Sequence, residues 1–220
     1  MIRHLVIFTR EPRVGQGKRR LARDVGEFTA YRFQYTMVAQ LLRTLARDRR
    51  WRTWLAVTPD RSRTWPQTVR TLAQGPGDLG QRMQAVLRRL PGGPVVIIGS
   101  DIPGIRAADV EAAFRALGRQ EAVFGPARDG GYWLIGLRRG RRGLNPFTEV
   151  RWSSEYALAD TLRNLRGRPV KLLRMLADVD DGEDWRRFQR GSSGSAPARL
   201  RNRGDTAAAP SADAASPPGG

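Results

Sequence analysis

Cysteine is absent from the 220 residues, and histidine occurs only once, as His4. Without cysteine the chain can form neither a disulfide framework nor a thiolate metal site or nucleophile. A single histidine near the amino terminus excludes a Ser-His-Asp triad and a histidine-rich metal site. A bound metal ion would therefore be a hard cation held by carboxylates.

Long apolar runs are also missing from the sequence. No stretch approaches the roughly 20 apolar residues that a membrane-spanning helix needs. The amino terminus has no hydrophobic signal segment of sufficient length. We therefore expect a soluble, cytoplasmic protein without a membrane span.

Lysine is scarce, since only Lys18 and Lys171 occur among the 39 basic residues, and the formal net charge is +18. Such a charge permits binding to nucleic acid or another polyanion through a basic face. However, no zinc finger, RNA-binding motif or interleaved basic and aromatic strand accompanies it. We expect a small-molecule substrate rather than nucleic acid, and a polyanion-binding module is the alternative.

The chain divides into one domain and a tail. Residues 1–190 contain the alternating apolar segments of a folded domain, whereas 191–220 are rich in Ala, Pro, Ser and Gly and have Leu200 as their only large apolar residue. Such a tail buries too little to offset the entropy of ordering it, so we expect it to be disordered.

Strand-like apolar runs alternate with amphipathic helical segments along the domain. We expect a cap-like Asp at the start of the helix over 77–90 and a Ser cap at the start of the helix over 153–165. The alternation predicts an α/β fold, a three-layer α/β/α sandwich around a mostly parallel sheet. The expected strands are 5–9, 51–59, 68–73, 94–101, 122–127, 132–137 and 170–176, and the expected helices are 27–49, 77–90, 107–118, 153–165 and a short final one.

Ligands of open parallel sheets bind at the carboxyl ends of the strands, so the residues after each strand are candidates. A basic loop with glycines follows the first strand; small residues let the backbone approach a phosphate, which the cations neutralise. The loop is not a Walker motif, because Pro12 and Arg19 stand where Gly and Ser or Thr are required. A solvated basic turn is the alternative. The candidate phosphate-binding residues here are Arg10, Gly15, Lys18 and Arg20.

Carboxylates follow two further strands. Asp101 precedes Pro103, which blocks continuation into a helix, so Asp101 would project from the strand end into a cleft. Asp178 and Asp180 follow the last strand and, as alternate residues of an extended segment, could share one target. A nucleotide-bound Mg²⁺ or Mn²⁺ takes one or two such carboxylates. Helix capping is the alternative for Asp101 and for the acidic residues from Asp181 onward.

Residues 125–137 read GPARDGGYWLIGL, in which an Asp-Gly pair lies between apolar runs. This is a common hairpin signal, and we expect Gly130 and Gly131 to turn the chain between two strands. The same glycines would let the backbone approach a ligand at that edge of the sheet. Tyr132 would offer a hydroxyl or a ring face, and Asp129 a carboxylate.

Six segments, taken in order, resemble the nucleotide-diphospho-sugar transferase (GT-A) fold. The particular likeness is to a bacterial GT-A-like family often labelled glycosyltransferase, in part of an arsenosugar-biosynthesis type. That family is related to the phospholactate guanylyltransferases and, more remotely, to molybdenum-cofactor guanylyltransferases. The segments are FTREPRVGQGKRRLA (8–22), GDLGQRM (77–83), VVIIGSDIPGI (95–105), FGPARDGGYWLIGL (124–137), VRWSS (150–154) and DVDDGED (178–184).

The resemblance implies a Rossmann-like GT-A sheet and a transferase that uses Mg²⁺ or Mn²⁺. It implies phosphate binding by Lys18 and Arg20 and metal binding by Asp101, with Asp178 or Asp180 as the second carboxylate. Arg19 departs from the family pattern, which usually has Thr between the Lys and Arg of this loop, and Val14-Gly15 replaces a usual Pro-Gly pair.

The remaining site residues follow from the same likeness. We expect Ser100 and Asp78 to bind the nucleotide, although Asp78 could contact a sugar, a base or only its own backbone. The loop of Gly130, Gly131 and Tyr132 is expected to face the acceptor, with Asp129 as the candidate general base.

The sequence leaves two transfer reactions open. The family labels favour a glycosyltransferase that uses a nucleotide-sugar and an unknown small acceptor. The basic loop favours a nucleotidyltransferase that holds a nucleoside triphosphate. We expect the first, with the second as the alternative.

Overall fold

The computed structural model of the chain describes residues 1–60, 64–65, 68–139 and 145–192. The predicted tail, 191–220, lies almost entirely outside the described residues and stays a prediction. None of the helices in the described ranges is long and apolar enough to cross a membrane.

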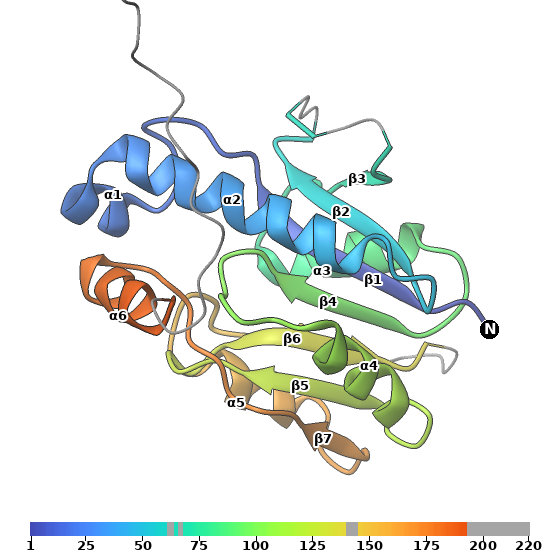
Figure 1. Ribbon diagram of the computed structural model, residues 1–220. Helices are drawn as coiled ribbons and strands as arrows, with labels where there is room; N and C mark the ends of the chain where they lie inside the picture. Colours follow the sequence, from blue (N-terminus) through green and yellow to red (C-terminus); the bar gives the residue numbers. More distant parts are fainter. Residues whose placement is uncertain (61–63, 66–67, 140–144, 193–220) are drawn as a thin grey trace, which may run out of the picture.

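The described strands form one mixed sheet in the order β3-β2-β1-β4-β6-β5-β7 (Figure 1). Only β6 runs antiparallel to its neighbours within the described ranges, so the carboxyl ends of the other strands share one edge. The predicted mostly parallel α/β sheet is confirmed. The strands are β1 (His4–Arg10), β2 (Arg52–Thr58), β3 (Thr71–Ala73), β4 (Val95–Gly99), β5 (Ala122–Pro126), β6 (Tyr132–Leu137) and β7 (Val170–Leu172).

Helices cover both faces of the sheet. Alternate residues of β1 point to opposite faces: Leu5 and Ile7 pack in one core with α2 and α4, and Val6 and Phe8 in the other with α3 and α5. The two layers of helices lie on either side of the sheet in Figure 1, which confirms the predicted sandwich. The helices are α1 (Arg19–Val25), α2 (Glu27–Leu45), α3 (Leu79–Arg89), α4 (Ala107–Ala116), α5 (Ala157–Arg163) and α6 (Gly182–Ser192).

A third core joins α1, α2 and α6 beside the carboxyl edge of the sheet (Figure 1). Phe33 of α2 makes edge contacts with Trp185 and Phe188 of α6, with ring centroids 5.4 and 5.7 Å apart. This packing holds the segment before α6 against the loop that follows β1. Sequence patterns did not predict α1, because its arginine-rich stretch has only Leu21 fully buried.

Several element boundaries differ from prediction, and the predicted strand over 170–176 ends at Leu172. The predicted helix over 27–49 ends at Leu45. The predicted Ser cap of the helix over 153–165 is wrong, because α5 begins only at Ala157. The Ser154 hydroxyl instead donates to the backbone oxygen of Arg151 at 2.6 Å, and Ser153 adopts a left-handed conformation with φ +58°. A local turn thus replaces the first helical turn.

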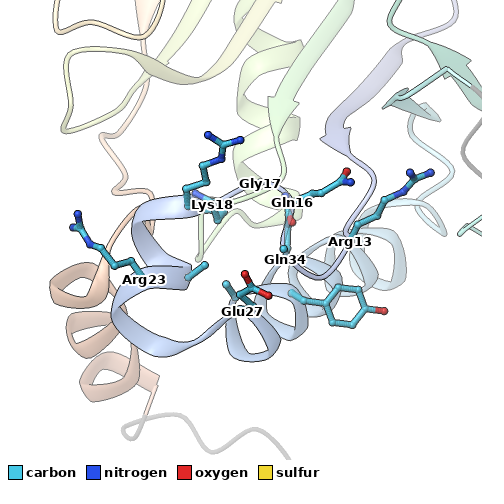
Figure 2. A pocket seen from close by; sticks show the side chains of 12 residues that line it. Arg13, Gln16, Gly17, Lys18, Arg23, Glu27 and Gln34 are labelled. Carbon is cyan, nitrogen blue, oxygen red and sulfur yellow. The ribbon is translucent and has the colours of Figure 1, made fainter.

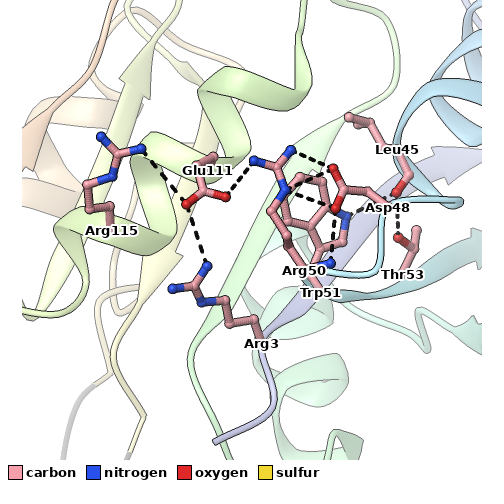
Figure 3. A network of polar contacts seen from close by, with 8 residues as sticks. All are labelled: Arg3, Leu45, Asp48, Arg50, Trp51, Thr53, Glu111 and Arg115. Carbon is pink, nitrogen blue, oxygen red and sulfur yellow. Dashed lines mark hydrogen bonds and ion pairs between the residues drawn. The ribbon is translucent and has the colours of Figure 1, made fainter.

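An ion-pair network joins α4 to the segments that precede β1 and β2, at the edge of the sheet where these strands begin (Figure 3). Arg50 pairs with Asp48 at 2.6 Å and with Glu111 of α4 at 2.8 Å, and Arg3 lies 3.8 Å from Glu111. The Arg50 guanidinium also covers the Trp51 ring. Part of the arginine excess therefore has a structural use here.

The β5–β6 turn confirms the hairpin prediction. Ala127 N–H donates to Gly131 O, and Gly130 adopts φ +84°, which glycine tolerates and other residues rarely do. A Cβ on Gly130 would lie 2.1 Å from the backbone oxygen of Glu155. Gly130 O also accepts from the Leu158 N–H. Gly130 thus approaches the backbone before α5, rather than a ligand as predicted.

Gly130→Ala should lower the free energy of unfolding by about 3 kcal/mol or more, because the new methyl group adds a backbone clash to left-handed strain. Gly104→Ala is the matched control: Gly104 has φ +85° but no atom within 4 Å of its would-be Cβ. The control should lose only about 1 kcal/mol. Both variants would be compared by denaturant unfolding. Equal losses of unfolding free energy would show that the contact with Glu155 contributes nothing to the cost of Gly130→Ala.

Candidate active site

Lys18 joins three segments that are far apart in the sequence. It lies in the loop after β1, and its Nζ is 2.7 Å from Asp101 Oδ2 after β4 and 2.6 Å from Asp180 Oδ1 after β7. The same Nζ donates to the backbone oxygen of Val179 at 2.8 Å. Only 8% of the Lys18 side chain is exposed. The three residues that the sequence placed at strand ends therefore converge at one point.

The backbone of the loop directs Lys18 to this position. Gly17 has φ +81°, and Lys18 itself adopts a left-handed conformation with φ +32° and ψ +45° at the start of α1. A lysine in this region is uncommon, and such conformations often occur at functional sites. The loop thus holds Lys18 in a backbone conformation that is unfavourable for a lysine but that directs its side chain toward Asp101 and Asp180.

Gly15 lies on another side of the loop. It lines a pocket of about 310 Å³ between the loop and α2, where Figure 2 shows Gln34 near Gly17 and Glu27 farther from it. A Cβ on Gly15 would meet the Glu27 carboxylate at 3.5 Å. The predicted phosphate contact of Gly15 is therefore not supported by its position.

A basic cleft of about 530 Å³ opens beside Lys18 at the carboxyl edge of β1 and β4. Its lining has five cationic side chains and two carboxylates, a formal charge of +3. Four of the predicted phosphate- or nucleotide-binding residues, Arg10, Lys18, Arg20 and Ser100, line it. The charged lining residues are Arg10, Lys18, Arg19, Arg20, Arg82, Asp101 and Asp180.

Asp78 does not line the basic cleft. Its Oδ1 accepts from the Gln81 N–H at 2.8 Å, while Gln81 Oε1 accepts from the Asp78 N–H at 3.0 Å. This reciprocal pair is a capping box at the start of α3. The sequence allowed three contacts for Asp78: a sugar, a base or the local backbone. The structure shows the last of these, a contact with the backbone of its own helix.

A second, acidic cleft of about 740 Å³ adjoins the first. Both clefts are lined by Arg20, Asp101 and Asp180, so they are two compartments of one site. Asp129 lines the acidic cleft with an exposed carboxylate, whose Oδ1 accepts from the Gly131 N–H at 2.9 Å. Gly131, Tyr132 and Asp178 line it too, whereas Gly130 does not.

Tyr132 reaches the acidic cleft with its ring rather than its hydroxyl. The ring packs edge-on against Phe124 and Trp152. The hydroxyl oxygen is buried beside the Thr161 hydroxyl, which itself donates to Ala157 O. Burial raises the pKa of Tyr132, which keeps the phenol protonated. Of the two predicted roles, the ring face fits its position better.

Opposite charges set the protonation of Lys18 and Asp180. Burial alone would lower the pKa of Lys18, but the Asp101 and Asp180 carboxylates outweigh burial and raise it. Burial would likewise raise the pKa of Asp180, and the Lys18 ammonium lowers it below its ordinary value. Both side chains are therefore charged near neutral pH.

The pKa of Asp178 shifts in the direction opposite to that of Asp180. Burial, followed by the negative charges of Asp180 and Asp129, raises the pKa of Asp178 to about 6. The charged form of Asp178 lacks a compensating cation among the described residues, and a nearby positive ion would stabilise it.

These carboxylates fit a hard divalent cation. Within the described ranges, no group of three or more His, Cys, Asp or Glu side chains is arranged to hold a metal ion by itself. The Lys18 ammonium lies between Asp101 and Asp180. Yet the donor oxygens are of the type that Mg²⁺ and Mn²⁺ prefer, and phosphate oxygens commonly complete such sites. The excess negative charge at Asp178 supports the same fit.

An aspartate that sequence patterns missed fixes the wall of the acidic cleft. Asp160 is 1% exposed and accepts from the Arg151 guanidinium at 2.8 and 2.9 Å, from the Arg151 N–H and from Arg163. These contacts hold the pKa of Asp160 well below its usual range. They anchor the segment with Trp152, which lines the cleft. The VRWSS segment was a signal for this region, but nothing local pointed to Asp160.

Folding stability should depend on pH through Asp178. Because its pKa is raised in the folded chain, stability is greatest when Asp178 is protonated and falls as pH rises from about 4 to above 6. In metal-free buffer, Asp178→Asn should match the wild type near pH 4 and melt on the order of 3 °C higher at pH 8.

Asp24→Asn provides a control of opposite sign. The Gly182 N–H lowers the pKa of Asp24, so this carboxylate stabilises the fold at neutral pH and loses that effect as pH falls. Its Asn variant should melt lower than the wild type at pH 8. A pH-independent difference between Asp178→Asn and the wild type would contradict the assigned titration.

Two solved structures of bacterial proteins share the fold. A candidate nucleotide-diphospho-sugar transferase from Desulfovibrio desulfuricans G20 superposes with a TM-score of 0.82 at 28% identity, over 89% of this chain and 90% of that one. Rv0371c of Mycobacterium tuberculosis H37Rv, solved with manganese, has a TM-score of 0.53 at 16% identity, over 86% of this chain and 99% of that one. The second likeness shows the fold alone.

Sequence comparison gives a closer chemical relationship. The 2-phospho-L-lactate guanylyltransferase of Methanopyrus kandleri is 30% identical over 172 residues, which cover 77% of this chain and 83% of the relative. Together with the fold, this relationship supports a transferase and agrees with the resemblance seen in the sequence. Residues 41–154 match a family model, and the chain therefore belongs to the family described as "uncharacterized protein conserved in bacteria (DUF2064)".

Proposed function

We propose that this protein is a metal-dependent nucleotidyltransferase, which moves a nucleoside monophosphate from a nucleoside triphosphate onto a hydroxyl of a small acceptor. The observation that carries this proposal is the charge of the basic cleft, where five cations face two carboxylates. The relationship to a guanylyltransferase supports the same reaction. The proposal revises the sequence-based preference for a glycosyltransferase.

Charge complementarity distinguishes between a nucleoside triphosphate and a nucleotide-sugar as the donor. A nucleoside triphosphate carries about four negative charges at neutral pH, and the diphosphate of a nucleotide-sugar about two. A cleft with a formal charge of +3 suits the more highly charged donor. Arg10, Arg20 and Arg82 lie around Lys18 and would share the phosphate oxygens.

The reaction joins the two clefts at their common wall. The acceptor hydroxyl, in the acidic cleft, attacks the α-phosphorus of the nucleotide in the basic cleft. A new O–P bond forms, the bond to pyrophosphate breaks, and Asp129 takes the proton of the hydroxyl. Lys18 and Arg20 stabilise the negative charge that develops on the pyrophosphate.

Asp101, Asp178 and Asp180 are the residues that would hold Mg²⁺ or Mn²⁺. When bound there, the ion supplies charge neutralisation for the phosphate oxygens. Lys18 must release at least one of its two carboxylates for this, and its ammonium then remains within reach of the phosphates. The manganese complex of the Rv0371c structure is consistent with a divalent cation in this fold.

Glycosyl transfer is the second candidate, favoured by the description of the Desulfovibrio relative. It would use the same cleft, but the acceptor would attack a sugar carbon and a nucleoside diphosphate would leave. The two reactions are separated by their products, because only nucleotidyl transfer from a triphosphate releases pyrophosphate.

Nucleotide binding should depend on Lys18 and Asp101. Binding would be measured by calorimetry with a panel of nucleoside triphosphates and nucleotide-sugars, each with Mg²⁺ or Mn²⁺. Lys18→Met should weaken binding of the preferred ligand about 30-fold or more, because a buried charged contact is lost. Asp101→Asn should weaken binding of the metal–nucleotide complex too. Lys171→Met, at the only other lysine of the chain, should bind as the wild type does. Absence of any ligand whose binding Lys18→Met weakens would refute the proposed site.

Asp129→Asn should lower kcat about 100-fold or more, as expected for loss of a general base, and leave the nucleotide Kd within about twofold. Asn keeps the side-chain oxygen that accepts from the Gly131 N–H, so the turn should persist. Turnover and nucleotide affinity would be measured on the same preparation, and equal losses in both would make Asp129 a structural residue of the turn.

A further inference from the structure

The acidic cleft has a charge opposite to that of the rest of the molecule. The chain carries a formal charge of +18, yet this cleft is lined by seven carboxylates and three guanidinium groups, which leaves −4. The charged lining residues are Asp101, Asp129, Glu155, Asp178, Asp180, Asp181, Asp184, Arg20, Arg128 and Arg187.

Some of these carboxylates have structural partners and others do not. Asp101 and Asp180 share Lys18, and Asp184 pairs with Arg187 at 3.2 Å. In contrast, no described basic side chain forms an ion pair with Asp129, Glu155 or Asp178. These three unpaired carboxylates come from three separate segments and face the same cavity.

A bound metal ion does not remove this excess. One divalent cation on Asp101, Asp178 and Asp180 would bring the formal charge of the lining from −4 to −2. The nucleotide phosphates in the neighbouring compartment add further negative charge. A negatively charged acceptor would therefore enter against repulsion from Asp129 and Glu155.

The uncharged part of the lining also suits a cation. Trp152 and Tyr132 present aromatic side chains to the cleft, and aromatic faces attract ammonium groups. The cavity thus combines negative charge with aromatic surface.

We propose that the acceptor is a small hydroxyl compound that carries an amine, in contrast to the phosphorylated acid named for the Methanopyrus relative. Glu155 and Asp129 attract the ammonium group, and the hydroxyl is left at the wall shared with the basic cleft. This inference rests on the proposed transfer reaction, and it concerns the charge of the acceptor only.

Three polyols of matched size test the charge preference: N-methylglucamine with a positive charge, glucitol with none and gluconate with a negative charge. Their affinities are measured by ligand-observed NMR on the full chain with Mg²⁺ and a non-hydrolysable triphosphate analogue. We expect N-methylglucamine to bind about tenfold more tightly than gluconate, with glucitol between them.

The double variant Asp129→Asn/Glu155→Gln should reduce this difference to about threefold or less. Glu183→Gln is the matched control, because Glu183 is 70% exposed on α6 and does not line the cleft, and it should keep the full preference. Equal or stronger binding of gluconate, or no detectable difference among the three probes, would overturn the inference.

Nucleotide calorimetry distinguishes failure of this inference from failure of the proposed function. If a nucleotide binds in a Lys18-dependent manner while gluconate binds best, only the acceptor class is wrong. If no nucleotide binds, the transfer reaction itself is wrong and the acceptor inference is overturned with it.

Discussion

The ammonium group of Lys18, held between Asp101 and Asp180, is the contact on which the site depends. A buried ammonium without carboxylates is unstable, and two facing carboxylates without a cation repel each other. Each partner therefore requires the others, and each comes from a different segment. The contact draws the loop after β1, the end of β4 and the approach to α6 to one point. Both clefts share residues of this junction, where donor and acceptor meet in the proposed reaction.

Arginine is distributed over three distinct environments in this protein. At the amino edge of the sheet, Arg3 and Arg50 form ion pairs with the carboxylates of Glu111 and Asp48, which fix helix and strand positions (Figure 3). Around the basic cleft, cationic side chains outnumber carboxylates by five to two. In the acidic cleft they are outnumbered by carboxylates. The formal charge of the chain therefore says little about its substrate, whereas the local charge of each compartment says a great deal.

The sequence predicts the strands well because most of them are continuous apolar runs that are buried on both faces. The strand ends locate Lys18, Asp101 and Asp180 for the same reason, since the carboxyl ends of parallel strands share an edge. Local patterns do not distinguish an aspartate that faces a ligand from one that caps a helix. Asp78 carries both signals, and only the packing of α3 places it in a capping box.

The acidic cleft could not be predicted from any one segment. Its wall combines the β5–β6 turn, the segment before α5 and the approach to α6, and its charge appears only when these meet. The same limit applies to Gly130, whose close approach to Glu155 is a long-range contact. Asp160 is hidden for a related reason, because a buried aspartate within a helix has no recognisable pattern before its arginine partners are known.

Among the described strands only β6 runs antiparallel to its neighbours, and this has a consequence for how the site can vary. Because β5 and β6 form a hairpin, their turn reaches the carboxyl edge without a crossover helix. This turn belongs to neither β1 nor β4, which carry the proposed phosphate-binding side. The proposed donor half of the site is thus built into the sheet, whereas the hairpin turn forms one wall of the proposed acceptor half. A changed β5–β6 turn would therefore reshape one wall of the proposed acceptor cleft while the proposed phosphate-binding side keeps its position.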